Sequence, residues 1–409
     1  MPKTRLIGPF SQLLPMTNIP LKGAVKDEKL LVVENAGILV SDGKISGIGR
    51  FDDLKSDDIK IEKIEGNTVC VPGFIDAHTH ICFAGSRAND YALRNAGKSY
   101  LEIAKAGGGI WDTVTKTRKA SQTELVNTII KRALKHLKSG VTTIEVKSGY
   151  GLTVEEELKM LRAIKEANTK TKPDLIATCL AAHMKPKDWN GSASSYLHEI
   201  SENLFPILKE ENLSNRIDAF IEESAFSPIE IAPYFQKARA MGFSITVHAD
   251  QFSVGGSETA VHYNAVSADH LEASSDREIE LLAKSSTISV ALPGASIGLG
   301  CNFTPARKLL DAGGALAIAS DYNPGSAPMG DLLTQASILG TFEKLSNAEV
   351  LAGITSRAAA ALELTDRGTL EKEKKADFIS FPTNNYKEIT YHQGQLKPIA
   401  IWKNGNKMS

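Results

Sequence analysis

The segment Phe74-Ile75-Asp76-Ala77-His78-Thr79-His80 is a short apolar run that ends in two histidines. Seven further apolar runs follow it, at residues 141–146, 175–181, 219–222, 244–248, 265–270, 287–292 and 315–321. Helical patterns intervene, for example at residues 123–134, and such alternation is typical of a parallel sheet covered by helices. Eight strand–helix units predict an α/β protein with a closed (β/α)8 TIM barrel. An open doubly wound sheet is the alternative, but no glycine-rich fingerprint follows the first strand.

Both ends of the chain contain short apolar or β-branched runs separated by turns. These runs cover residues 30–33, 37–40 and 44–49 at one end and residues 376–381 and 399–405 at the other. Asp42-Gly43 predicts a hairpin turn, because such turns need residues with positive φ. We expect residues 1–72 and 366–409 to form one small β-sandwich domain beside a barrel at residues 73–365. Two separate β ribbons are the alternative.

The composition is that of an ordinary globular protein. Of the 409 residues, 42% are hydrophobic and 23% are charged, which excludes a disordered chain. The 47 basic and 48 acidic residues leave a net charge of −1, so we expect no general attraction to nucleic acid or to an anionic membrane. The apolar runs are shorter than the about 20 residues that cross a bilayer, and no secretory signal is visible. The four cysteines show no paired spacing, so we expect reduced thiols and a cytoplasmic protein.

Polar side chains follow most of the expected barrel strands. In TIM barrels the carboxyl ends of the strands carry the active site, so we expect these side chains to converge on one mouth. Five of the nine histidines are among them. The residues at these strand ends are His78, His80, Glu145, Lys147, His183, Glu222, His248, Asp250, Asp269, His270, Ser320 and Asp321.

Four of these residues form a candidate metal site. His78 and His80 are two residues apart in an extended segment, so both side chains point to the same side. A lone histidine after a strand packs in the core more often than it binds a metal. Together with His248 and Asp321, however, the pair makes a set of three imidazoles and one carboxylate, which suits zinc or iron. We expect one metal ion, Zn²⁺ or Fe²⁺/Fe³⁺, at these four residues.

The stretch Pro72-Gly73-Phe74-Ile75-Asp76-Ala77-His78-Thr79-His80 closely resembles the opening signature of the amidohydrolase superfamily. That superfamily consists of metal-dependent hydrolases with a (β/α)8 barrel and a β-sandwich formed by both chain ends. His183, His248, His270 and Asp321 follow in the order that the superfamily shows. No lysine matches the carboxylated lysine that bridges the metals of two-metal members, so the resemblance implies the one-metal subtype.

Further stretches resemble the imidazolonepropionase family, and this resemblance covers essentially the whole chain. They are Ala84-Gly85-Ser86-Arg87, Ala106-Gly107-Gly108-Gly109-Ile110, Glu145-Val146-Lys147-Ser148-Gly149-Tyr150-Gly151, His248-Ala249-Asp250-Gln251 and Ser320-Asp321-Tyr322-Asn323-Pro324-Gly325-Ser326. The resemblance implies a metal-dependent cyclic amidohydrolase of histidine degradation. It would open the imidazolone ring of 4-imidazolone-5-propanoate to give N-formimidoyl-L-glutamate. It would act on this small molecule and form a homodimer, as barrel enzymes of this family commonly do.

The resemblance and the chemistry together assign roles to single residues. Asp321 is the expected proton acceptor, because a ligand carboxylate touches the attacking water and can pass the proton to the leaving nitrogen. His270 is expected to be a second acid/base or carbonyl-orienting group, unless it only packs behind the ligands. Arg87 offers a planar fork for the propionate carboxylate. The other expected substrate contacts are Tyr150, His183, Gln251, Asn323, Gly325, Ser326 and Tyr100.

Two alternative functions stay open at this point. The first is another one-metal enzyme, either a deaminase of an aromatic ring amine or a different cyclic-amide hydrolase. Gln251 argues against a deaminase, because many one-metal members have a glutamate acid/base there and an amide has no proton to titrate. The second is a non-catalytic barrel that serves as a scaffold. Such a protein should have lost metal ligands, whereas all four are present.

Overall fold

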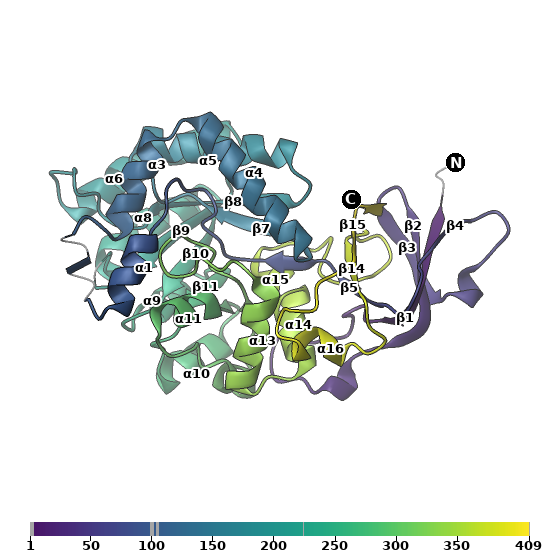
Figure 1. Cartoon of the computed structure of the whole chain (residues 1–409). Coiled ribbons are helices and arrows are strands. Elements are labelled where there is room, and N and C mark those ends of the chain that lie inside the picture. Colours follow the sequence, from purple (N-terminus) through teal and green to yellow (C-terminus); the bar gives the residue numbers. More distant parts are fainter. Residues whose placement is uncertain (1–3, 99–101, 104–105, 224, 409) are drawn as a thin grey trace.

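A computed structural model describes residues 4–98, 102–103, 106–223 and 225–408 of the chain. It contains a barrel of parallel strands wrapped by helices, and a second sheet that both chain ends build at one side of the barrel (Figure 1). None of the described helices has the length and apolar character that crossing a membrane requires.

The barrel strands follow one another in chain order, each parallel to its neighbours. They are β6 (Phe74–Asp76), β7 (Val141–Lys147), β8 (Asp174–Ala182), β9 (Arg216–Ile221), β10 (Ser244–Ala249), β11 (Ser267–His270), β12 (Ile288–Ala291) and β13 (Leu316–Ile318). The first and last strands meet just beyond their ends, where Thr79 and Tyr322 form a parallel bridge. The amide of Asp321 also donates to the carbonyl of His78 at 3.0 Å. The predicted barrel and its eight strands are confirmed.

Helices cover the outside of the barrel (Figure 1). They are α1 (Ala88–Asn95), α3 (Ile110–Lys119), α4 (Gln122–Lys138), α5 (Val154–Lys170), α6 (Ala193–Asn203), α7 (Phe205–Glu210), α8 (Pro228–Ala240), α9 (Gly256–His262), α10 (Asp276–Lys284), α11 (Pro293–Leu299), α12 (Ala306–Asp311), α13 (Leu332–Glu343), α14 (Asn347–Gly353), α15 (Ser356–Ala361) and α16 (Lys387–Tyr391). The helix predicted at residues 123–134 is α4. It begins with a capping box, in which the Ser121 hydroxyl accepts from the Glu124 amide and the Glu124 carboxylate accepts from the Ser121 amide.

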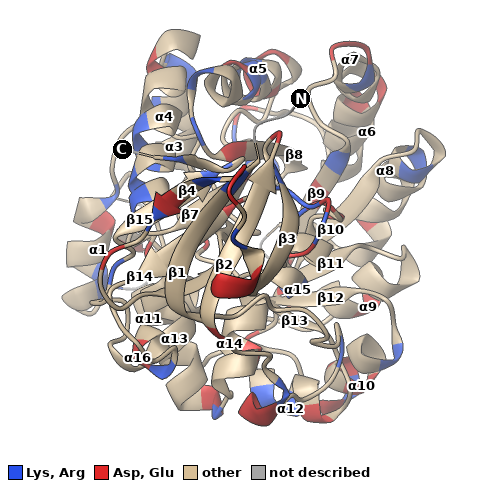
Figure 2. Cartoon of the chain, turned by 90° about the vertical axis from the view of Figure 1, so that its right-hand side faces the viewer, with Lys and Arg blue, Asp and Glu red and all other residues tan. Residues whose placement is uncertain are grey.

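The second sheet mixes strands from both ends of the chain. Its strands are β1 (Arg5–Leu13), β2 (Val33–Ser41), β3 (Lys44–Arg50), β4 (Lys60–Lys63), β5 (Val69–Pro72), β14 (Phe378–Phe381), β15 (Ala400–Lys403) and β16 (Asn406–Lys407). β1 pairs with β2, β4 and β5, and β5 in turn pairs with β14. Figure 2 looks onto this sheet, with the barrel behind it. The two chain ends therefore build one shared β domain, as predicted, and its strands form one mixed sheet. The domain boundaries at residues 72 and 365 stay a prediction.

The predicted hairpin and one predicted strand have different outcomes. Asp42 and Gly43 have φ values of 51° and 79°, and they connect β2 to β3 as the hairpin signal predicts. The strand predicted at residues 30–33 is wrong, because β2 begins only at Val33 and a 3-10 helix, η1 (Asp27–Lys29), precedes this segment. The apolar side chains of Leu30 and Val32 pack against the core of the barrel.

The junction between sheet and barrel leaves the carboxyl ends of the barrel strands open. Gly73 separates β5 from β6, and a Cβ atom there would lie 2.4 Å from the Thr142 hydroxyl oxygen, so only glycine fits. At the opposite ends of the strands, Asp174 at the start of β8 lies 2.9 Å from the ammonium groups of Lys375 and Lys403. These ion pairs fasten the second sheet to the amino ends of the barrel strands.

Candidate active site

Three histidines and one aspartate converge at the carboxyl ends of the barrel strands. The Nε2 atom of His80 lies 3.2 Å from Nε2 of His78 and 3.3 Å from Nε2 of His248. Oδ1 of Asp321 lies 3.4 Å from Nε2 of His80 and 3.6 Å from Nε2 of His78. All four side chains are buried. The structure therefore brings the four predicted metal ligands together.

Two carboxylates behind the histidines determine which ring nitrogens face this cluster. Nδ1 of His78 donates to Oδ2 of Asp269 at 2.6 Å, and Nδ1 of His248 lies 3.1 Å from Oδ2 of Asp218. Burial alone would raise the pKa of Asp218, but the charges of His248 and Lys147 outweigh it and lower the pKa, whereas burial raises the pKa of Asp269 to about 7 against the opposing charge of Lys147. In the ionised form each carboxylate only accepts hydrogen bonds, so its imidazole then carries the proton on Nδ1 and the lone pair on Nε2. Nitrogen lone pairs that face one another at 3.2–3.3 Å repel unless a cation lies between them. This donor set therefore fits a divalent metal ion.

The pKa values in the cluster favour the protonation states that metal binding needs. Burial lowers the pKa of His248 to about 4. Burial and the nearby Lys147 ammonium also lower the pKa of His78. Burial alone would raise the pKa of Asp321, but the hydrogen bond and charge of His80 outweigh it and lower the pKa. At neutral pH, His78 and His248 are therefore neutral and the aspartate is ionised.

His270, at the end of β11, lies beside the same cluster. Its ring centroid is 5.3 Å from that of His248, and its Nδ1 is 3.4 Å from a carboxylate oxygen of Glu272. Burial alone would lower the pKa of His270, but the charge of Glu272 outweighs it and raises the pKa. His270 also forms a second possible ligand set with His78 and Asp321. A proton on His270 is thus favoured close to the ligands, which suits an acid/base or carbonyl-orienting group.

A cavity of about 510 Å³ opens above the cluster. Its lining contains the predicted substrate contacts Arg87, Tyr150, His183, Gln251, Asn323, Gly325 and Ser326. Tyr100, the remaining one, lies outside the described residues. Other residues of the lining were not predicted from the sequence, among them Asp90, Arg94, Phe220, Phe252 and Leu299. The apolar members carry no motif, and the two charged members lie in an ordinary polar helix, so only the tertiary structure identifies them.

Arg87 is held in place by a carboxylate on the helix that follows it. Its Nε donates to Oδ2 of Asp90 at 2.7 Å, and the same oxygen accepts from the Gly109 amide at 2.8 Å. The guanidinium group lies against Gly325, where a Cβ atom would come within 2.2 Å of Nη1. Asp90 thus joins Arg87 to the glycine-rich segment that precedes α3, and Gly325 leaves room for the arginine fork.

The turn after β13 orients Asp321. Nδ2 of Asn323 donates to Oδ2 of Asp321 at 2.8 Å, and Oδ1 of Asn323 accepts from the amides of Gly325 and Ser326 at 2.7 and 2.8 Å. The hydroxyl of Ser326 also reaches Oδ2 of Asp321 at 3.3 Å. These residues therefore hold the oxygen of Asp321 that faces away from the histidines.

Two further buried carboxylates hold loops at the mouth. Glu157 in α5 accepts hydrogen bonds from the amides of Gly149, Gly151 and Leu152 at 2.8–3.0 Å, and this loop carries Tyr150. The carbonyl of Gly149 in turn accepts from Nδ1 of His183 at 2.9 Å.

Glu222, at the end of β9, acts in the same way on the loop after β10. It accepts from the amide of Phe252 at 2.8 Å and from the hydroxyl of Ser253 at 2.5 Å. That loop carries Gln251, so Glu222 shapes the mouth without lining the cavity.

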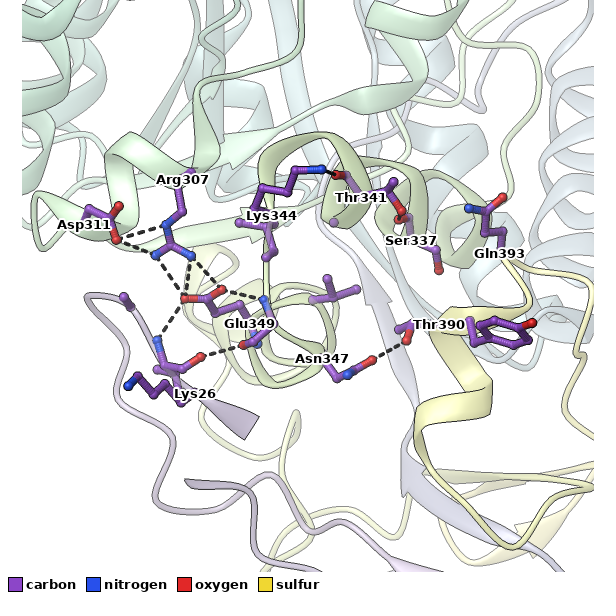
Figure 3. A pocket seen from close by; sticks show the side chains of 17 residues that line it. Lys26, Arg307, Asp311, Ser337, Thr341, Lys344, Asn347, Glu349, Thr390 and Gln393 are labelled. Carbon is purple, nitrogen blue, oxygen red and sulfur yellow. Dashed lines mark hydrogen bonds and ion pairs between the residues drawn. The ribbon is translucent and has the colours of Figure 1, made fainter. Parts of the chain in front are cut away.

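A second cavity, of about 910 Å³, lies among α12, α13, α14, α16 and residues 24–26 (Figure 3). Its central cation, Arg307, donates to Asp311 and to Glu349 at 3.0 Å each. Glu349 also accepts from the amide of Val25 at 2.9 Å. These charged groups satisfy one another, and the lining shares no residue with the cluster of histidines. We therefore place the candidate active site at the barrel mouth.

Comparisons with known proteins show the family of this chain. The amidohydrolase family model matches residues 69–408. The imidazolonepropionase of Acinetobacter baumannii is 39% identical over 380 residues, which are 92% of this chain and 94% of that protein. The imidazolonepropionase of Bacillus cytotoxicus is 38% identical over 408 residues, which are 98% of this chain and 96% of that protein. The chain belongs to the imidazolonepropionase family of the amidohydrolases.

The solved structures share the fold of this imidazolonepropionase family member. An adenosine deaminase from Xanthomonas campestris with bound zinc has a TM-score of 0.71 at 18% identity, over 98% of this chain and 92% of that chain. At this identity the likeness concerns the fold alone. The family membership confirms the resemblance that the sequence motifs indicate.

Proposed function

We propose that this chain hydrolyses the imidazolone ring of 4-imidazolone-5-propanoate to N-formimidoyl-L-glutamate in histidine degradation. One observation carries the proposal: His80, His248 and Asp321 of the cluster line a cavity that Arg87 also lines, and His78 lies directly beside His80. Membership in the imidazolonepropionase family supports it. A metal-dependent cyclic amidohydrolase needs both features, one for the ring amide and one for the propionate.

These four residues would hold one metal ion, Zn²⁺ or Fe²⁺/Fe³⁺. Such an ion supplies a hydrolytic nucleophile at neutral pH and polarises the carbonyl under attack. Two of the three imidazoles present their lone pairs because Asp269 and Asp218 hold the opposite ring nitrogens of His78 and His248.

Asp321 takes the proton of the attacking water. Its pKa lies below that of an ordinary aspartate, so the carboxylate is ionised at neutral pH. Asn323 and Ser326 hold its Oδ2, so Oδ1 faces the histidines. The same carboxyl group can then give the proton to the leaving ring nitrogen. His270, whose pKa is raised by Glu272, would orient the carbonyl or serve as a second acid.

The cavity walls would bind the rest of the substrate. Asp90 accepts from the Nε of Arg87, and within the described part of the chain no hydrogen bond occupies the two terminal nitrogens, which would bind the propionate carboxylate. Tyr150 and His183 lie beside His80, with ring centroids 6.0 and 5.7 Å from it, and would contact the ring. Gln251 has no titratable proton, so we assign it a hydrogen bond to the ring and no proton transfer.

The test is turnover of authentic 4-imidazolone-5-propanoate by the purified protein, followed as loss of its ultraviolet absorbance. Metal content is measured on the same sample. Pterin, cytosine and adenosine analogues are assayed in parallel, because a deaminase with the same metal site would act on one of them. Turnover of an analogue without turnover of the imidazolone would contradict the proposal.

We also propose a cytoplasmic homodimer that binds neither nucleic acid nor membranes. The net charge of −1 supports the absence of such partners, and acidic and basic segments are interspersed over the face that Figure 2 displays. Light scattering behind a sizing column measures the dimer, and a monomer at micromolar concentration would contradict it.

A further inference from the structure

A buried lysine lies beneath the ligand cluster. The side chain of Lys147, at the end of β7, is fully buried, and its Nζ lies 2.7 Å from Glu145, 2.7 Å from Asp218 and 3.8 Å from Asp269. The cavity lining, as far as the described residues form it, includes none of these four side chains. Their charges therefore act on the site through other residues.

The contacts run from the lysine to two of the candidate ligands. Oδ2 of Asp269 is the oxygen that accepts from Nδ1 of His78, and it is also the oxygen nearest Lys147. Oδ2 of Asp218 is likewise shared between Nδ1 of His248, at 3.1 Å, and the lysine ammonium. Each carboxylate oxygen is thus fixed between an imidazole on one side and Lys147 on the other.

The third carboxylate reaches the backbone between the two other histidines. Oε1 of Glu145 accepts from Lys147, and its Oε2 accepts from the amide of Thr79 at 3.2 Å. The hydroxyl of Thr79 donates to the carbonyl of Glu145 at 2.6 Å. The lysine is therefore linked to the segment that carries His78 and His80 as well.

Three carboxylates around one ammonium are costly to bury, so the cluster is weak evidence for stability. Without the ammonium, the carboxylates would repel one another in a site that excludes water. They would then turn away from the positions that hold His78 and His248. Outer partners of this kind orient metal-binding histidines and fix their tautomers.

We propose that Lys147 is a positioning residue for the metal centre, because its ammonium holds Asp218 and Asp269 where they direct the Nε2 lone pairs of His248 and His78 toward the metal. The inference rests on the metal site proposed above. It assigns Lys147 no contact with substrate and no step in the reaction.

Whether Lys147→Met weakens or tightens metal binding distinguishes a positioning role of Lys147 from a purely electrostatic one. Lys147 is a cation near a cation site, so a purely electrostatic role predicts that Lys147→Met tightens metal binding. A positioning role predicts that the same change weakens binding, by about 10–100-fold for the loss of an outer partner.

The experiment uses full-length apoprotein titrated with Co²⁺ and with Zn²⁺ against a competing chelator. The visible spectrum of the cobalt protein reports its coordination geometry independently of activity. Lys403→Met is the matched control, because Lys403 is also buried between carboxylates, 2.5 Å from Asp377 and 2.9 Å from Asp174, but belongs to the second sheet. Unfolding midpoints of all variants are measured alongside.

We expect Lys147→Met to bind both metals about 10–100-fold more weakly and to change the cobalt spectrum. Lys403→Met should lower the unfolding midpoint and keep the native metal affinity. Unchanged or tighter binding by Lys147→Met overturns the inference, as does an equal loss in Lys403→Met. The titration of the native protein tests the metal site itself. If the native protein binds neither metal, both the proposed metal site and the inference about Lys147 are contradicted.

Two further variants keep the inference testable if Lys147→Met does not fold. Lys147→Met combined with Glu145→Gln restores the net charge of the cluster but still leaves Asp218 without its ammonium, so it should fold and bind metal weakly. Adding Asp218→Asn to that variant should weaken metal binding little further, because Lys147 acts on the metal site through the Asp218 carboxylate. Native metal affinity in the double variant overturns the inference. A further large loss of metal affinity on adding Asp218→Asn also overturns it.

Discussion

Arg87 is expected to bind the propionate carboxylate of the substrate. Its side chain is 11% exposed and held by Asp90, so a carboxylate that pairs with it is largely removed from water. Losing one partner of such a charge pair costs about 2–5 kcal/mol. At 1.4 kcal/mol per decade, this is a loss of about 30-fold to several thousand-fold in affinity. Arg87→Met should therefore raise KM by a factor in this range and leave the metal content unchanged.

The assay for Arg87→Met follows the ultraviolet absorbance of 4-imidazolone-5-propanoate over a wide concentration range. Arg87→Lys should recover only part of the loss, because lysine keeps the charge without the two-pronged geometry. An imidazolone without the carboxylate is the substrate control, and it should be poor for the native protein and no worse for Arg87→Met. If the variant has the native KM for the full substrate, the carboxylate binds elsewhere, and Tyr150 is the next candidate.

Three further predictions concern the metal site, the mechanism and the junction between the barrel and the second sheet. His78→Ala, His248→Ala and Asp321→Ala should each abolish both bound metal and activity, and full metal occupancy in one variant would remove that residue from the ligand set. Gln251→Glu should keep the metal and change kcat less than Asp321→Ala does, whereas an equal collapse would make the amide essential. Burial alone would raise the pKa of Asp174, but the surrounding cations outweigh burial and lower it. The ionised aspartate therefore stabilises the folded protein above the ordinary aspartate pKa of about 3.9, and this contribution is lost as the pH falls below that value. Asp174→Asn should lower the thermal midpoint at pH 7 and have less effect as the pH drops below about 4, and a pH-independent difference would contradict this.

The barrel was predictable because its signals are local. Each strand is a continuous apolar run, and the residues after the strands are drawn from the few types that bind metals or move protons. The segment 30–33 shows the limit of such local signals, because Leu30 and Val32 have the composition of a strand but pack against the barrel core without pairing. An apolar pattern says that side chains are buried and does not say whether the backbone belongs to a sheet.

The candidate ligands were predictable for the same local reason, whereas their supports were not. Lys147 and Asp269 could be placed at strand ends, but nothing in their spacing indicates that both meet behind His78. Asp90 lies in a polar helix and has no motif of its own. Its role follows only from the oxygen that it shares between Arg87 and Gly109.

The buried carboxylates that orient the site residues form two groups, one behind the metal cluster and one behind the cavity walls. Asp269 and Asp218 hold histidines of the metal cluster, whereas Asp90, Glu157 and Glu222 hold the arginine and the loops that line the cavity. All five are buried, and each accepts from, or lies within 3.1 Å of, a group that must keep one orientation. A displacement of about 1 Å is enough to slow an enzyme by two orders of magnitude, so such anchoring matters for rate as well as for folding. Because separate carboxylates hold the two sides of the site, the walls that select the substrate can change in sequence while the metal cluster keeps its geometry.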